Sequence, residues 1–320
     1  MSDQSPDGAR LPDDWTDHPA TARIDNLLTG GCQHYDADCR LAARLVRAAP
    51  GLPDMVAINQ RHRPHAVTVL AQELNITQFL DLGCGLPSSR WNGTLQRHDP
   101  ALTYEAARLV HPDARVVYVD HDPAVYAHAR TELDTHPATA AVYADIRRMG
   151  ELLATSGVQR LDRTRPIAVL LHDLLPWVSD TEAQQALAAL RTWLPDGSAL
   201  SVTHACTDLA PQTMADLVTC YIEAGLVYRP RTRDHIQALL GDWGLLPPGL
   251  VPTAQWRPLP PRMERRRPRA ECSFAYAAIA TAPPRRPNPP SAGTDTVVAE
   301  PPFTAAPQAA RRADARTDAD

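Results

Sequence analysis

The sequence contains no lysine: all 32 of its lysine or arginine positions are arginine. This absence excludes Schiff-base chemistry on a lysine and the lysine of a nucleotide phosphate-binding loop. The six cysteines are scattered, with neither a C-x-x-C pair nor the cysteine and histidine spacing of a zinc site. We therefore expect reduced thiols and no bound metal.

Membrane and nucleic-acid signals are also missing. No apolar run approaches the roughly 18 residues of a membrane span, and the first residues lack the basic and apolar regions of a signal peptide. A formal net charge of −5 gives no broad positive footprint for nucleic acid. We predict a cytoplasmic protein whose partner is a small-molecule substrate, not nucleic acid or a membrane.

Composition and periodicity divide the chain into four segments. Residues 1–20 are polar and acidic, and we predict that they are disordered. Residues 21–76 carry three helical patterns and read as an N-terminal helical cap, in which Pro64 is expected to kink or interrupt the third helix. Residues 77–283 form the main domain. Residues 284–320 lose all periodicity and are predicted to be a disordered tail rich in proline, alanine and arginine.

The main domain alternates strand and helix patterns. The strand candidates are residues 78–82, 115–119, 140–143, 167–171 and 199–203. Helical patterns follow at about 102–110, 124–133, 149–153, 182–194 and 211–223, and a further segment of unassigned type lies at about 234–240. This alternation predicts an α/β fold with a Rossmann-like, doubly wound parallel sheet, and a late strand near 273–279 fits a closing antiparallel strand.

The first strand runs into a glycine turn, T-Q-F-L-D-L-G-C-G at residues 77–85. Asp81 ends the strand, and Gly83 and Gly85 allow a sharp turn and close approach of a ligand. The third glycine of the dinucleotide fingerprint is missing, because Ser88 stands at that position. The remaining D-x-G-x-G pattern resembles the cofactor loop of S-adenosylmethionine (SAM)-dependent methyltransferases, although an ordinary strand-to-helix turn has the same composition.

The next two strands also end in acids. Asp120, followed by His121, can accept hydrogen bonds from both hydroxyls of a ribose. Asp145 can accept from an exocyclic amine such as that of adenine, with Ile146 packing on the ring. Three strand-end acids behind the glycine turn favour an adenosine-type ligand, and the lack of a diphosphate site favours SAM over NAD.

The fourth and fifth strands end in histidine, and each histidine is a candidate general base. His172 is followed by Trp177, which is either a wall of the site or part of the core, and His204 ends the fifth strand. Structural roles for both histidines remain open. An arginine strip at 229, 231 and 233 is interpreted as a solvated face in preference to an anion site.

Several stretches together are similar to one family. They are A-R-I-D-N-L-L-T-G-G at 22–31, Q-F-L-D-L-G-C-G-L-P at 78–87, P-D-A-R-V-V-Y-V-D-H-D-P at 112–123, and G-L-V-P at 249–252 with W-R-P at 256–258. Over about residues 19–283 the chain resembles the actinobacterial S-adenosyl methyltransferase family, once known only as a domain of unknown function. The resemblance implies a Rossmann-like methyltransferase with SAM against Asp81, Gly83, Gly85, Asp120 and Asp145.

The resemblance further implies that Arg23, Asp25 and Gly31 of the opening helix close over the cofactor. The sequence departs from the family pattern where Cys32 replaces a lysine, at roughly 88–100, where about ten residues are added, and at 175–177, where the family's Leu-His-Phe reads Leu-Pro-Trp. If that histidine acts in relatives, His172 is the nearest substitute.

Our main hypothesis is a SAM-dependent methyltransferase acting on a small molecule, such as a secondary metabolite. The alternative is a SAM-binding sensor or regulatory protein without methyl transfer. A nicotinamide-dependent oxidoreductase is the third hypothesis, and the missing third glycine counts against it.

Overall fold

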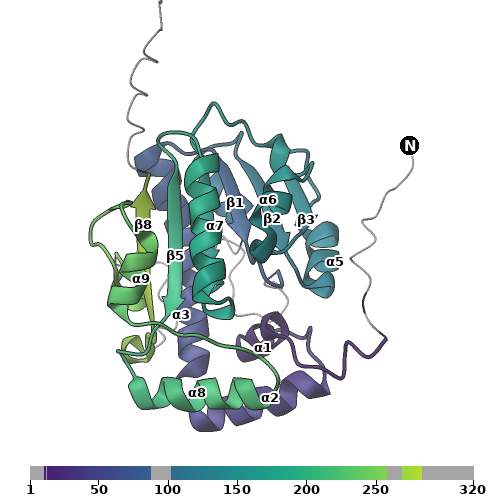
Figure 1. Cartoon of the computed structure of the whole chain (residues 1–320). Helices are drawn as coiled ribbons and strands as arrows, with labels where there is room; N and C mark the ends of the chain where they lie inside the picture. The colour runs from purple at the N-terminus through teal and green to yellow at the C-terminus, as the bar shows by residue number, and fades with distance from the viewer. Residues whose placement is uncertain (1–10, 12, 88–101, 258–268, 283–320) are drawn as a thin grey trace, which may run out of the picture. The chain divides into compact units, whose positions relative to one another are not determined.

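The fold is built on a mixed sheet of mostly parallel strands (Figure 1). The computed structural model describes residues 11, 13–87, 102–257 and 269–282. The strands are β1 (Gln78–Leu82), β2 (Arg115–Asp120), β3 (Thr139–Tyr143), β4 (Ala168–His172), β5 (Ala199–Ala205), β6 (Gly244–Leu245), β7 (Val251–Pro252) and β8 (Ala275–Thr281). Their order is β3-β2-β1-β4-β5-β8-β6, and β7 also pairs with β8.

The first five strands are parallel, and β8 is antiparallel to β5. The predicted wound sheet and its late antiparallel strand are therefore confirmed. The helices are α1 (Thr21–Leu28), α2 (Asp36–Ala48), α3 (Leu52–Leu74), α4 (Thr103–Arg108), α5 (Pro123–Glu132), α6 (Met149–Ala154), α7 (Asp180–Trp193), α8 (Pro211–Glu223) and α9 (Arg233–Leu240).

Successive side chains of each strand point to opposite faces of the sheet, so a hydrophobic core forms on both faces. In β1, Leu80 and Leu82 pack with the cores of α6 and α7, whereas Phe79 packs with α3 and α4 on the other face. Both faces are apolar because a parallel sheet is covered by helices on both sides. Figure 1 shows α7 in front of the sheet and α3 behind it.

Helix α3 continues through Pro64, so of the expected kink or interruption the interruption is wrong. A proline inside a helix removes one backbone hydrogen bond and crowds the preceding turn. Here the buried side chains of Val67 and Leu70 anchor the segment after Pro64 to the sheet. Packing along the helix outweighs the local cost of the proline, because tertiary contacts provide most helical stability in proteins.

Helices α1, α2 and α8 share a third apolar cluster, which includes Ala205 at the carboxyl end of β5. Figure 1 shows α2 and α8 side by side. The N-terminal helices are held together by Arg23, whose Nε donates to Asp38 Oδ2 over 2.8 Å. The three helices therefore lie near the carboxyl ends of the strands, where a wound sheet binds its ligands.

The described part of the chain shows no cluster of three or more His, Cys, Asp or Glu side chains that would hold a metal ion. No helix within the described ranges is long and apolar enough to cross a membrane. The added residues near 88–100, most of the arginine-rich stretch at 262–269 and the predicted tail lie outside the described residues.

Candidate active site

A cavity of about 90 Å³ lies at the point where the strand order reverses, between β1 and β4. Chain connections leave these two strands in opposite directions, which opens a crevice beyond their carboxyl ends. The lining residues come from α1, from α3, from the turn after β1 and from the end of β4: Ala22, Asp25, Asn26, Thr29, Val56, Asn59, Gln60, Arg63, Cys84, Gly85, Leu86, His172 and Asp173. The N-terminal helices thus form one wall of the candidate site.

The glycine turn forms the opposite wall. Gly83 and Gly85 have φ angles of +67° and +68°, in the left-handed region that favours glycine. A Cβ added to Gly83 would lie 2.8 Å from the Leu174 side chain, whereas one added to Gly85 meets nothing within 4 Å. The space beside Gly85 is therefore open to a ligand, while Gly83 is needed for close packing within the protein.

Asp81, which precedes the glycine turn, is bound to a neighbouring helix. Its side chain is fully buried, and its Oδ2 accepts a hydrogen bond of 2.6 Å from the Thr103 hydroxyl of α4. Its Oδ1 is buried without a partner among the described residues. Asp81 does not line the cavity, so a contact with a ligand at this position remains a prediction.

Asp120 joins the end of β2 to the glycine turn. Its Oδ2 accepts from the Gly85 backbone N–H over 3.1 Å, and its Oδ1 accepts from that of Asp122 over 3.0 Å. Burial raises the pKa of Asp120, and these two backbone hydrogen bonds oppose the shift only in part. Each carboxylate oxygen has a second lone pair, so the hydroxyls of a ribose can still be accepted. His121 stands beside it with its side chain 58% exposed and Nδ1 3.7 Å from Asp120 Oδ1.

The carboxylate at the end of β3 already has a hydrogen-bond partner that the sequence does not indicate. The Asp145 carboxylate accepts from Arg147 Nε over 2.8 Å and from the Arg147 backbone N–H over 2.9 Å. Burial raises the pKa of Asp145. The hydrogen bonds from Arg147 lower that pKa by a larger amount, so it falls below the ordinary value. Ile146 is buried in the core on the α6 and α7 side. An adenine amine would have to share Asp145 with Arg147, and this contact stays a prediction.

The structure does not favour His204 as a base. The ring is fully buried, its Nε2 accepts from Arg231 Nη1 over 2.8 Å, and its Nδ1 donates to the Ala205 carbonyl over 2.7 Å. Burial lowers its pKa to about 3. Because both ring nitrogens are engaged and the residue does not line the cavity, neither nitrogen reaches a substrate there.

His172 does line the cavity, but its chemistry is weak for a base. Its Nε2 is 2.9 Å from the Ser201 hydroxyl, and its Nδ1 has no partner among the described side chains and backbone. Burial, then His62 and Arg63, hold its pKa well below the ordinary value. A base with a low pKa binds a proton poorly near neutral pH.

In the arginine strip, Arg229 and Arg233 are exposed, as a solvated face predicts, but Arg231 is not. Its side chain is buried, and its Nε donates to Asp180 Oδ1 over 2.8 Å. The same guanidinium donates to the carbonyls of Leu175 and Val178 over 2.9 and 3.0 Å. Arg231 therefore has a structural role, because its hydrogen bonds hold the segment that follows β4 in place.

The polar residues of the cavity that received no role from the sequence include Arg63, Asn59 and Asp173. Arg63 of α3 donates from Nη1 to the Cys84 carbonyl over 2.7 Å, and its Nε is buried with no partner in the described residues. Asn59, one helical turn earlier, has a buried Oδ1 that is likewise unpartnered within the described ranges. Asp173 follows β4. The signal that could have found the first two is their i, i+4 spacing on the inward face of a predicted helix.

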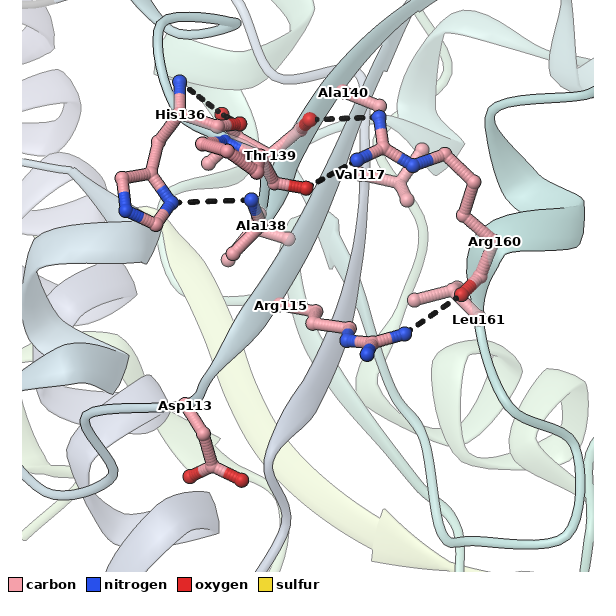
Figure 2. A pocket seen from close by; sticks show the side chains of 11 residues that line it. Asp113, Arg115, Val117, His136, Ala138, Thr139, Ala140, Arg160 and Leu161 are labelled. Carbon is pink, nitrogen blue, oxygen red and sulfur yellow. Dashed lines mark hydrogen bonds between the residues drawn. The ribbon is translucent and has the colours of Figure 1, made fainter.

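A larger cavity of about 500 Å³ lies at the other end of the strands (Figure 2). Arg115, at the start of β2, donates to the Arg160 carbonyl, and Arg160 in turn donates to the Thr139 carbonyl over 3.0 Å. Figure 2 shows these guanidinium groups directed to the backbone. Size does not make this the ligand site, because both of its arginines are bonded to backbone carbonyls and it lies at the amino ends of β2 and β3.

The sequence matches the S-adenosyl methyltransferase family over residues 12–283. The chain belongs to this family. The crystal structure of a DUF574 family protein from Streptomyces avermitilis is 30% identical, with a TM-score of 0.75, and the match covers 84% of this chain and 99% of that one. A putative methyltransferase from Thermobifida fusca is 34% identical, with a TM-score of 0.73 and coverage of 88% and 99%. No curated protein matches the chain.

Of the three opening-helix residues assigned by resemblance in this methyltransferase, only Asp25 lines the cavity. Arg23 is buried and bound to Asp38, so it secures α1 to α2 without reaching the site. Gly31 acts through a neighbour, because a Cβ there would lie 2.3 Å from the Asn26 side chain, which lines the cavity. Asp25 is thus the best-placed of the three to contact the cofactor.

Proposed function

We propose that the protein transfers the methyl group of SAM to a small-molecule acceptor at the cavity between β1 and β4. The observation that carries this proposal is the assembly of Gly85, Asp25, Arg63 and Asp173 around one space at the strand-order reversal. Family membership supplies the chemistry, and the cavity supplies a place for it.

The charged side chains suit the amino-acid end of SAM. The unpartnered Nε of Arg63 can donate to a carboxylate, and Asp25 can accept from an ammonium group. These two side chains interact already: burial raises the pKa of Asp25 to about 7, and the Arg63 guanidinium works against that rise. At the other end of the cofactor, Asp120 is held by two backbone N–H groups in a position to accept from a ribose.

When bound, SAM supplies a methyl group activated by a positive sulfonium. The protein's own contribution is mainly to fix the acceptor in line with that methyl group, since orientation alone can remove a large part of a reaction barrier. The walls formed by α1 and α3 exclude water from the reacting end. A base that takes the acceptor's proton completes the requirement.

Calorimetric titration of the full chain with SAM and with S-adenosylhomocysteine tests the proposal. We expect both to bind, Asp120→Ala to weaken binding strongly, and Asp113→Ala, an exposed acid at the far end of the sheet, to leave it unchanged. The absence of both heat and a melting-temperature shift at millimolar SAM would overturn it. A protein that binds SAM but never forms S-adenosylhomocysteine with mixed acceptors would be a SAM-binding regulator instead.

A further inference from the structure

Resting on the methyl transfer proposed above, we infer that the acceptor is an amine and that Asp173 binds its nitrogen and takes its proton. The inference concerns the acceptor side of the cavity only. Its support is the position of Asp173, an unsatisfied carboxylate oxygen, and the charge balance of the cavity.

Asp173 occupies a strained position at the carboxyl end of β4. Its φ is +54°, one of few non-glycine residues in the left-handed region, and its backbone N–H donates to the Thr203 carbonyl over 2.9 Å. Strained backbones of this kind persist where the surrounding structure enforces them, and they cluster at functional sites. The turn places Asp173 on the cavity lining with Gly85.

One oxygen of this carboxylate lacks a hydrogen bond. Asp173 Oδ1 is buried without a partner in the described part of the chain. A buried acceptor left unpaired destabilises the protein, and a donor on a ligand would remove that cost. An ammonium group brings up to three N–H donors and a positive charge, whereas an alcohol brings one O–H.

Charge balance within the cavity points the same way. Asp25 and Asp173 face a single guanidinium, that of Arg63, among the lining residues. If Asp25 and Arg63 hold the two charged groups of the cofactor's amino-acid end, Asp173 is left as the acid for the acceptor. His172 next to it does not compete, since its pKa lies well below the ordinary value.

The chemical step balances without another reactant. The acceptor ammonium gives one proton to the Asp173 carboxylate and becomes a neutral amine. Its nitrogen lone pair then forms the bond to the methyl carbon as the carbon–sulfur bond breaks, and that bond's electron pair remains on sulfur. Burial, and then the Asp25 carboxylate, raise the pKa of Asp173 well above the ordinary value, which makes it a better proton acceptor.

Matched amine and alcohol pairs test the inference on the full chain saturated with S-adenosylhomocysteine. The probes are benzylamine against benzyl alcohol and butylamine against butanol, measured by calorimetry. We expect each amine to bind at least tenfold more tightly than its alcohol, and Asp173→Asn to abolish this preference. Asparagine keeps the shape and tolerates the left-handed backbone. The control Asp113→Asn should retain the preference.

The outcomes separate the two proposals. If S-adenosylhomocysteine does not bind, the proposed function fails. If it binds equally to the wild type and to Asp173→Asn but neither amine is preferred, or if the preference survives in Asp173→Asn, the amine inference alone is overturned. A loss of S-adenosylhomocysteine affinity in Asp173→Asn would assign this acid to the cofactor and would also overturn it.

Discussion

Replacing Arg63 by glutamine should weaken cofactor binding strongly while leaving the fold intact. Arg63 lines the cavity, and its Nε is buried without a partner among the residues described. Its Nη1 already donates to the Cys84 carbonyl over 2.7 Å, so the guanidinium is held in place before any ligand arrives. A fixed, desolvated donor next to the glycine turn is suited to a carboxylate.

The size of the effect follows from the bonds that are lost. Hydrogen bonds to charged groups contribute about 1.5–3 kcal/mol, and each 1.4 kcal/mol is a factor of ten in affinity. Arg63→Gln should therefore raise the dissociation constant of S-adenosylhomocysteine by about 10- to 100-fold. Arg63→Lys keeps the positive charge but loses the planar guanidinium, so its dissociation constant should lie between those of the wild type and Arg63→Gln.

Calorimetric titration, with a thermal melt of each variant, measures the effect. The matched control is Arg40→Gln, which removes an exposed guanidinium from α2. Wild-type melting and unchanged affinity for S-adenosylhomocysteine in Arg63→Gln would refute a role of this side chain in cofactor binding. An equal loss in the control would show instead that the net charge of the protein, not this side chain, governs binding.

Three further predictions concern the frame of the site. Gly83→Ala and Gly85→Ala should each lower the free energy of unfolding by about 1 kcal/mol, because both positions have positive φ angles. Gly83→Ala should lower it by more than Gly85→Ala, since its new methyl group would lie 2.8 Å from a side chain. Urea titration measures both values. Arg231→Met should lower the free energy of unfolding by about 3 kcal/mol, because it leaves buried carbonyls and a buried histidine unpaired; a loss below 1 kcal/mol would contradict its central role. His62 is buried, and burial lowers its pKa from 6.5 to about 3, so below pH 6.5 the unfolded chain binds more protons than the folded one. Stability should fall by about 2 kcal/mol from this group between pH 7 and pH 5, and His62→Asn should show a correspondingly shallower pH dependence in denaturant titrations.

The sheet was predictable from the sequence because its strands are buried on both faces. Such strands are continuous apolar runs, and Arg115–Asp120 was placed to within one residue. The two-residue strands β6 and β7 were not predicted, because two residues carry no periodicity. Pro64 was expected to kink or interrupt the third helix because proline disfavours a helix interior. The packing of this long helix keeps it continuous through Pro64.

The site was predictable only in part. Parallel strands bring their carboxyl ends to one edge, so the glycine turn and Asp120 were expected to meet, and the hydrogen bond between Gly85 and Asp120 joins them. The resemblance predicted that α1 closes over the site, but nothing in the sequence indicated that α3 also lines the cavity, so Arg63 had no assigned role. Nor does a position at the end of a strand tell which groups a histidine will contact, and His204 is held by Arg231.

The roles proposed above for Asp120 and Asp173 fit a contrast between the two side chains. Asp120 accepts from two backbone N–H groups, so its carboxylate is held rigidly and binds whatever hydroxyls are brought to it without rearrangement. Asp173 has a buried oxygen with no partner in the described ranges and sits on a strained turn. A cofactor common to a family needs the rigid anchor. An acceptor that must be bound, deprotonated and released as product needs the acid whose hydrogen bonds are still to be made.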